Sequence, residues 1–432
     1  MNDRNEIVFA ISKVGASHLP KGVPCQDYSL IVNEEDTQMI VVCDGHGSKT
    51  YVRSDVGSRL AAEITKTVLS DFVKDTSSDL FLGKKGAVTA RPELDDTMWG
   101  ATPNKLIESM TEAERMNYEQ NQLFFNQVKD IREQDNVFKL LFEKIYGKWI
   151  EAIKKDSEEH PFTEEEKTAL GNHRIEKAYG STLMAFVKTP CYWFALHIGD
   201  GRLITVDRHL DMAQPVPWDC NCFQNFTTSL CNTNPVRLFR YAFDGTGNFP
   251  AAVFCCSDGI EDSYGDYELK PDNLHRFYQG LLDQFVKVGV DTTLRNIEDF
   301  LPVLSEKGSK DDMSLAAIIN IKAIIDGLAE KIEDEIHIQE SELQNLQEQK
   351  SAIECQINNT EKKLKDLKED SIFTTLESNN DKYESGNDKF DSNSDMAESD
   401  NDKPIPDNVV TGSNNEKSQK SFFEKLREKL KR

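Results

Sequence analysis

The stretch MIVVCDGHG, residues 39–47, decides the fold of this chain. Its first five residues are apolar and end at Asp44 in a Gly-rich turn, so the stretch predicts a strand that leads into a loop. An apolar run without alternation predicts a strand that is buried on both faces. The next segment, residues 54–73, has the apolar spacing of a helix, and Ser54 or Asp55 is expected as its N-cap.

The design of an apolar strand next to an acidic turn recurs later in the sequence. Residues 251–263, AAVFCCSDGIEDS, repeat it, and residues 311–321, DDMSLAAIINI, carry two aspartates directly before an apolar strand. Residues 181–207 predict two consecutive strands. Strands and amphipathic helices are therefore expected to alternate through residues 1–320.

A different composition interrupts this pattern between the first helix and the later strands. Residues 75–104 contain Gly, Pro, Ser and Thr, which predicts a loop, whereas the residues that follow have helical spacing. Thr163 and Glu166 are spaced as the two members of a capping box. We therefore expect one domain over residues 1–321, with a helical insertion at about 105–175.

Beyond residue 321 the apolar residues recur at alternating steps of four and three. Sustained through residues 322–370, this pattern predicts either a coiled coil or a single long helix packed on the domain. The apolar seam consists of Ile332, Ile336, Leu343, Leu346, Ile353, Ile357, Leu364 and Leu367, interrupted by Gln339, Lys350 and Thr360. A coiled coil predicts self-association through residues 325–370.

The C-terminal part of the sequence has two segments of opposite charge. Residues 371–415 contain ten acidic and three basic residues and few apolar ones, which predicts a disordered acidic linker. Residues 416–432 contain seven basic and three acidic residues, with four apolar side chains on one helical face. This basic amphipathic tail is either a membrane-surface or partner-binding helix, or a solvated terminus.

Composition excludes several classes of function. The net charge of −24 argues against sequence-independent nucleic-acid binding, which needs basic surface. The nine cysteines include no C-x-x-C pair, so a zinc ribbon is not expected; Cys220, Cys222 and Cys231 either share a metal or are reduced thiols in a loop. With no signal peptide and no apolar run of membrane-spanning length, the sequence predicts a cytoplasmic protein without a transmembrane segment.

Four acidic sites lie at the ends of apolar segments, and they carry the chemistry that the sequence suggests. They are Asp27, Asp44, Asp258 and Asp311. Buried strands that bring carboxylates together must neutralise their charge, and Mg²⁺ or Mn²⁺ does so with carboxylate and carbonyl oxygens as ligands. Any single Asp-Gly is more often a hairpin turn. Four strand-end sites in one domain favour a metal centre.

The order of these motifs supports a more specific reading. DGHGS at 44–48, SDGIED at 257–262 and DDMS at 311–314 follow one another in this sequence. The chain resembles the metal-dependent protein phosphatases of type 2C (the PPM family), bacterial type, over about residues 7–321. The resemblance implies an α+β fold, an α-β-β-α sandwich of two antiparallel sheets flanked by helices.

The resemblance also implies an activity and the residues that perform it. The activity would be hydrolysis of phosphoserine and phosphothreonine in proteins by a metal-bridging hydroxide, with Mg²⁺ or Mn²⁺ as two core ions and a weaker third. A cognate Ser/Thr kinase would be a partner. The implied ligands are Asp44 as the bridge, the Gly45 carbonyl, Asp27 through water, Asp258 and Asp311 on the other ion, and Asp200 with Asp262 at the third.

His46 matches the general acid of the family, although a structural histidine that closes the turn is the alternative. Three positions depart from the family pattern. Gln26 stands where a glutamate is common, which predicts weaker metal binding. Gly22 stands where an arginine grips the phosphate, and Lys21 would substitute as a point charge. Asp312 stands where asparagine is usual.

Three functions remain open from the sequence. The first is an active protein serine/threonine phosphatase in a signalling pathway. The second is a catalytically weak scaffold that binds phosphoproteins and assembles through the coiled coil, and the third is a phosphatase of a small phosphorylated metabolite. Residues 207–250, where the family carries a variable flap, are expected to set substrate choice.

Overall fold

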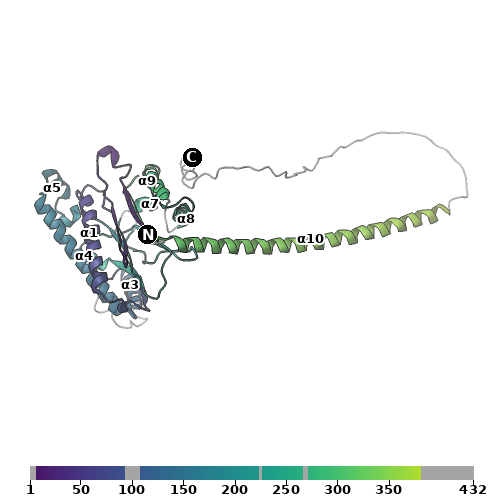
Figure 1. Cartoon of the computed structure of the whole chain (residues 1–432), viewed down its shortest axis with the longest axis horizontal. Helices are drawn as coiled ribbons and strands as arrows, with labels where there is room; N and C mark the ends of the chain where they lie inside the picture. The colour runs from purple at the N-terminus through teal and green to yellow at the C-terminus, as the bar shows by residue number, and fades with distance from the viewer. Residues whose placement is uncertain (1–5, 93–107, 223–225, 266–270, 381–432) are drawn as a thin grey trace. The chain divides into compact units, whose positions relative to one another are not determined.

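Two antiparallel β-sheets form the centre of the domain in the computed structural model, which describes residues 6–92, 108–222, 226–265 and 271–380 (Figure 1). The first sheet has the order β1 (Glu6–Lys13), β11 (Met313–Asn320), β10 (Ala252–Cys256), β7 (Arg202–Val206) and β8 (Met212–Ala213). The second has the order β2 (Tyr28–Asn33), β3 (Gln38–Cys43), β5 (Leu183–Lys188), β6 (Trp193–Ile198), β9 (Arg240–Asp244) and β4 (Lys85–Val88).

Helices cover the outer face of each sheet. Figure 1 shows α1 (Ser54–Asp75) and α4 (Arg132–Glu159) on one side, and α8 (Pro271–Val288) and α9 (Val290–Lys307) on the other. The resulting α-β-β-α sandwich confirms the fold that the sequence predicts. The other helices are α3 (Glu112–Val128), α5 (Glu164–Leu170), α6 (Ile175–Ala178), α7 (Asp258–Asp262) and α10 (Ile321–Asn380), with 3₁₀ turns at Leu19–Lys21, Ser78–Leu80 and Pro235–Arg237.

The alternation of side chains along β3 explains why an entirely apolar strand suits this architecture. Met39, Val41 and Cys43 pack in the cluster under α1 and α4, whereas Ile40 and Val42 pack in the cluster between the two sheets. All six residues of the strand are buried. Each apolar residue therefore has a core to enter on either face, as the sequence predicts.

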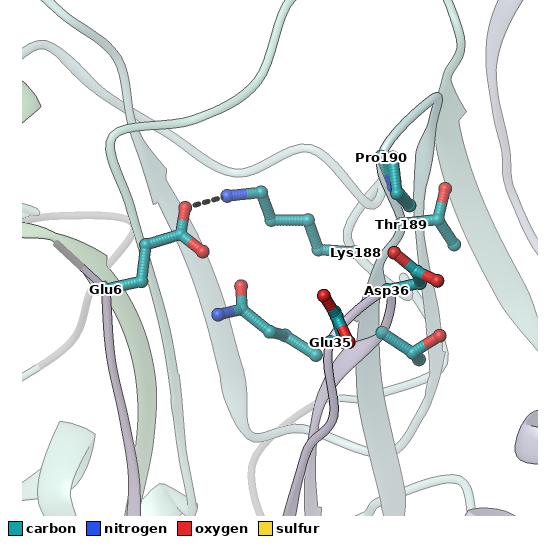
Figure 2. Close-up of a pocket in the computed structure, with 8 residues that line it drawn as sticks. Glu6, Glu35, Asp36, Lys188, Thr189 and Pro190 are labelled. Atoms are coloured by element: carbon teal, nitrogen blue, oxygen red, sulfur yellow. Dashed lines mark hydrogen bonds and ion pairs between the residues drawn. The ribbon is translucent and has the colours of Figure 1, made fainter. Parts of the chain in front are cut away.

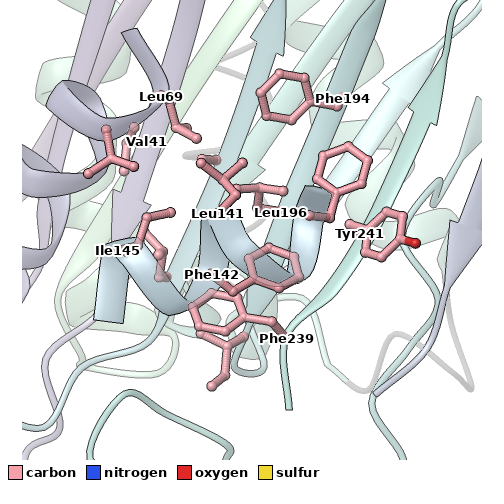
Figure 3. Close-up of a cluster of buried hydrophobic side chains, with 14 of the residues drawn as sticks. Val41, Leu69, Leu141, Phe142, Ile145, Phe194, Leu196, Phe239 and Tyr241 are labelled. Atoms are coloured by element: carbon pink, nitrogen blue, oxygen red, sulfur yellow. The ribbon is translucent and has the colours of Figure 1, made fainter. Parts of the chain in front are cut away.

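Aromatic side chains join the helical insertion to the second sheet (Figure 3). Phe142 of α4 stacks on Phe239 with ring centroids 4.6 Å apart, and Phe138 stacks on Tyr241 at 4.3 Å. The indole of Trp149 donates a hydrogen bond of 3.1 Å to the carbonyl of Gly57 in α1. These contacts make the insertion an integral layer of the fold.

Local details of the structure differ from the sequence-based expectations at two places. Residues 85–88, expected within a loop, form the edge strand β4, which pairs with β9. The helix α1 begins at Ser54 with Arg53 as its N-cap, so neither predicted N-cap residue caps it. The capping box of Thr163 and Glu166 is present at the start of α5.

The chain divides into two units, and α10 belongs to both. Its first turns belong to the unit that ends at Lys331, where Ile324 is fully buried among the residues under α8 and α9. In the unit that begins at Ile332, every residue from 332 to 371 is exposed. The expected acidic linker at 371–415 overlaps α10 up to Asn380, and the rest of it, with the tail at 416–432, lies outside the described residues.

Among the helices that the structure describes, none is both long and apolar enough to cross a bilayer. All nine cysteines are free thiols, and the structure does not bring Cys220, Cys222 and Cys231 together as a metal-binding group within its described ranges.

Arg53 connects the start of α1 to the helical insertion, and we expect its loss to be costly. Its guanidinium donates to both carboxylate oxygens of Glu166 at 2.9 and 3.0 Å and to the carbonyl of His160 at 2.6 Å, and it lies 4.0 Å from the Phe162 ring centroid. Because Arg53→Met removes a buried guanidinium and its bonds to three partners, it should lower the free energy of unfolding by about 3 kcal/mol in urea denaturation.

Arg59→Met is the matched control on the same helix. Arg59 is 43% exposed and forms a single ion pair of 3.6 Å with Glu63, so its loss should change the free energy of unfolding by less than about 1 kcal/mol. Equal losses in the two variants would contradict the role assigned to Arg53.

Candidate functional site

Strand register explains how the predicted aspartates come together. In the second sheet Tyr28 pairs with Cys43, and the next pair in this register is Asp27 with Asp44. In the first sheet Arg202 pairs with Cys256, and continuing that register places Asp200 opposite Asp258. The two pairs therefore lie where strands of each sheet begin or end.

The loop that carries Asp44 is fixed by the segment before β5. The Asp44 amide donates to the Thr182 hydroxyl at 3.0 Å, the Thr182 amide donates to the Asp44 carbonyl at 2.8 Å, and the His46 amide donates to the Gly180 carbonyl at 3.2 Å. A Cβ at Gly45 would lie 2.5 Å from the carbonyl oxygen of Gln26. This position therefore requires glycine, since no side chain fits between the two backbone segments.

Asp258 and Asp311 approach each other through β10 and β11. These strands are antiparallel, and Cys256 pairs with Leu315, so the turn after β10 lies beside the turn before β11. The Ser314 amide donates to the Ser257 hydroxyl at 3.0 Å across this junction. A Cβ at Gly259 would lie 2.1 Å from the carbonyl oxygen of Asp312, which shows how closely the two turns pack.

The carboxyl groups interact strongly enough to disfavour their ionised forms. Burial raises the pKa of Asp44 well above its usual value, and the charges of Asp258, Asp27 and Asp200 raise it further. Asp258 has a raised pKa for the same reasons, from burial first and then from Asp200, with Asp311 and Asp27 also contributing. These carboxylates therefore need protons or cations to lie together.

Asp27 has a buried polar atom that the described protein groups leave without a partner. Its side chain is 5% exposed, and its Oδ2 atom is buried without a hydrogen-bond partner among the described residues. Burial and the Asp312 charge raise its pKa from 3.8 to about 7, against the lowering effect of the Ser257 and Ser314 hydroxyls. Carboxylate oxygens are the ligands that hard divalent cations prefer, and here a buried, unpaired one lies beside other carboxylates.

Two of the expected site residues, Asp262 and Lys21, are exposed. Asp262 is exposed on α7, whereas its neighbour Glu261 is buried and pairs with Arg202 at 2.6 and 2.8 Å. Lys21 is exposed in the 3₁₀ turn after His18, and its side chain forms no hydrogen bond or ion pair with the described residues. The adjacent Gly22 has a φ of 64° and nothing within 4 Å of an added Cβ.

Asp312, which the sequence left without a role, anchors the loop that carries Asp27. Its carboxylate accepts hydrogen bonds from the Gly15 amide at 2.5 Å and the Gln26 amide at 2.6 Å, and it lies 3.0 Å from His18 Nδ1. The donor atoms of His18, Asp311 and Asp312 also lie within 4.8 Å of one another. No sequence motif reveals this network, because its members are almost 300 residues apart.

Gln26 also has a definite position in the structure. Its side-chain amide donates to the Ser54 hydroxyl at 2.7 Å and to the carbonyl oxygen of His46 at 3.4 Å. An ionised glutamate could make neither of these bonds as a donor. The amide therefore supports the loop that carries His46.

The imidazole of His46 lies against an aromatic ring and a cation. Its ring centroid is 4.6 Å from that of Tyr51, whose hydroxyl accepts a hydrogen bond from Lys177. Burial first, and then the charge of Lys177, lower the pKa of His46 from 6.5 to about 4. His46 is therefore neutral at pH 7 when no substrate is bound.

A cavity of about 180 Å³ lies at the opposite end of β3 from the aspartate cluster. It is lined by Gln38, the first residue of β3, whereas Asp44 directly follows the last residue of this strand. Figure 2 shows the ion pair of Glu6 with Lys188 beside Glu35 and Asp36. This cavity is separated from the aspartate cluster by the length of the strand.

Comparison with known proteins agrees with the motifs. The family model of protein phosphatase 2C matches residues 14–301 and confirms the resemblance. Among solved structures, the serine/threonine phosphatase Stp1 from Staphylococcus aureus is 14% identical, with 72% of this chain and 94% of that chain covered and a TM-score of 0.38.

Two further solved structures are similar to the chain. PppA of Pseudomonas aeruginosa, described as a regulatory component of the T6SS, is 14% identical, with 73% and 97% covered and a TM-score of 0.37. RsbX in complex with magnesium is 9% identical, with 74% and 96% covered and a TM-score of 0.35. No curated protein sequence is significantly similar to this chain.

Proposed function

We propose, on the premise that the chain belongs to the protein phosphatase 2C family, that it is a metal-dependent protein serine/threonine phosphatase. The proposal is carried by two observations: continued strand register brings Asp27 beside Asp44 and Asp200 beside Asp258, and the Oδ2 atom of Asp27 is buried without a hydrogen-bond partner among the described residues. Such a cluster has no structural benefit without cations.

The residues that would hold Mg²⁺ or Mn²⁺ can be named from this arrangement. They are Asp44 as the bridge, Asp27, the Gly45 carbonyl, Asp258 and Asp311, with Asp200 and Asp262 at a weaker third position. When bound, the ions supply positive charge for the phosphoryl oxygens and lower the pKa of water. Asp312 and Gln26 position the two loops that carry these ligands.

His46 would donate a proton to the leaving oxygen. Its pKa of about 4 is too low for this task in the free protein. A phosphate dianion bound beside the ring would favour the protonated form and raise the pKa. The proton-donor role therefore depends on substrate binding.

The deciding experiment is a titration of Mn²⁺ and Mg²⁺ with three substrates: an aryl phosphate, a phosphothreonine peptide and a small phosphorylated metabolite. Metal-dependent release of phosphate with preference for the peptide supports the proposal. Preference for the metabolite favours the alternative substrate class, and tight peptide binding without turnover favours a scaffold. No metal-dependent release from any substrate would refute phosphatase activity.

Self-association through α10 is a second part of the proposal. The eight seam residues are exposed by 50 to 66%, which is unusual for large apolar side chains along one helical face. Residues 332–349 carry six acidic and no basic residues, whereas residues 350–368 carry five basic and three acidic residues, a net +2. We therefore propose an antiparallel pair of α10 helices, because this orientation places the acidic half of one copy opposite the basic half of the other.

A further inference from the structure

Lys177 is held at the edge of the candidate site by the backbone. It lies in the short helix α6, directly before the segment that is bonded to the Asp44 loop. The Arg53 amide donates to the Ala178 carbonyl at 2.9 Å, and the His46 amide donates to the Gly180 carbonyl at 3.2 Å. These two bonds fix the residues on either side of Tyr179 to the segment that carries His46.

The side chain of Lys177 is directed toward the same segment. Its ammonium group donates a hydrogen bond to the Tyr51 hydroxyl and lies 4.4 Å from the Tyr51 ring centroid. The His46 imidazole also packs against Tyr51, with the two ring centroids 4.6 Å apart. Lys177, Tyr51 and His46 therefore form a contiguous group next to Asp44.

The ammonium group retains unused donor capacity. Lys177 is partly exposed, and among the described residues the hydrogen-bond partner of its ammonium group is the Tyr51 hydroxyl. An ammonium group has three N–H donors, and the Tyr51 hydroxyl accepts one. Two arginines whose charges act on Asp200 differ in this respect: Arg202 and Arg240 are at most 1% exposed and bound to protein acceptors.

A phosphate ester that enters an acidic site needs a cation from the protein as well as bound metal ions. The position expected for an arginine is Gly22, which has no side chain, and the neighbouring Lys21 makes no contact with the cluster. Lys177 is held beside the segment that carries His46 and is oriented by the Tyr51 hydroxyl. Its charge is therefore available where Lys21 is not.

We propose that Lys177, oriented by the Tyr51 hydroxyl, binds the phosphoryl oxygens of the substrate beside His46. This inference rests on the proposed phosphatase function and adds the protein residue that recognises the phosphate monoester. Its ligand class is a phosphate monoester dianion or inorganic phosphate.

The test compares phosphate affinity in Mn²⁺-loaded variants. Lys177→Met should weaken binding of inorganic phosphate, measured by calorimetry, and raise KM for an aryl phosphate by roughly tenfold to a hundredfold, the expected loss for a hydrogen bond from a charged donor. Lys177→Arg should retain affinity within about threefold, because a cation remains. Lys66→Met, at an exposed position of α1, is the matched control and should leave affinity unchanged.

Additional measurements separate binding from structural effects. Tyr51→Phe should weaken phosphate binding by less than Lys177→Met, because the cation remains while its orientation is lost. Lys177→Gln provides a second neutral variant if Lys177→Met does not fold, and Mn²⁺ affinity should match that of the parent protein in each folded variant.

Unchanged phosphate affinity in both neutral variants would overturn the inference. A shifted pH profile of kcat with unchanged phosphate affinity would overturn it too, since Lys177 would then act only through His46. Lys177-dependent phosphate binding without turnover of any substrate would refute the proposed function and leave the inference standing.

Discussion

Asp44→Asn should abolish metal-dependent phosphate release while leaving the metal-free protein at least as stable as the parent. Asp44 is the proposed bridging ligand, and its loss should lower kcat by roughly a thousandfold or more, about 4 kcal/mol of transition-state stabilisation. Its carboxyl group is also surrounded by Asp258, Asp27 and Asp200, each of which raises its pKa. A neutral amide removes that repulsion.

The stability of the metal-free protein should reveal this repulsion through its pH dependence. Asp27 has a folded-state pKa of about 7 against the usual 3.8, so the folded state binds more protons between these values. Stability is therefore expected to fall as pH rises from about 4 to 7. Thermal unfolding at pH 5 and pH 7.5 should show this fall, and Asp44→Asn should reduce it because one charge is removed.

Added Mn²⁺ should make the parent protein more stable than Asp44→Asn. It should raise the unfolding temperature of the parent by several degrees at pH 7.5, since only the folded state offers the site. Asp44→Asn should respond weakly. Asp36→Asn, at an exposed turn, is the control and should behave as the parent does in activity and in both unfolding experiments. Parent-like activity in Asp44→Asn would remove Asp44 from the site.

The sequence could predict the aspartate cluster because its members are adjacent to apolar strands. Once Tyr28 pairs with Cys43 and Arg202 with Cys256, the positions of Asp27 and Asp258 follow from register alone. The short edge strand β4 was missed, since Gly86 within only four residues weakens any strand pattern. Its pairing depends on β9, which lies about 150 residues away in the sequence.

The supporting contacts of the site could not be predicted from local patterns. Asp312 receives hydrogen bonds from Gly15 and Gln26, and the pairing of β1 with β11 brings these segments together. Lys177 lies in a four-residue helix without a recognisable motif, and its proximity to His46 depends on the Tyr51 ring. Motifs identify groups that follow strands, whereas residues that orient those groups depend on tertiary packing.

Replacing Leu346 and Ile353 by lysine should convert the proposed dimer to a monomer. Both side chains are in the middle of the exposed seam, at 55% and 56% exposure. Two charges in each copy of a buried interface would cost more than the remaining apolar contacts provide. Sedimentation equilibrium should show half the parent mass, and hydrolysis of an aryl phosphate should be unchanged, because the aspartate cluster is in the other unit.

The exposed positions Gln344 and Asn358 provide the matched control. Their replacement by lysine adds the same charge to α10 outside the seam, so the dimer should persist. A monomeric parent protein would contradict self-association, and a dimer that survives the seam substitutions would locate the interface elsewhere.

Salt then distinguishes the two orientations of the pair. In an antiparallel pair the acidic residues 332–349 face the basic residues 350–368, so this attraction should weaken as NaCl is raised from 50 mM to 500 mM. In a parallel pair the six acidic residues of each copy would face one another, and screening should tighten the dimer instead. A dissociation constant that rises with salt therefore supports the antiparallel arrangement, and one that falls with salt supports the parallel arrangement. The apolar seam is the same in both orientations, so the salt response reports the charged residues.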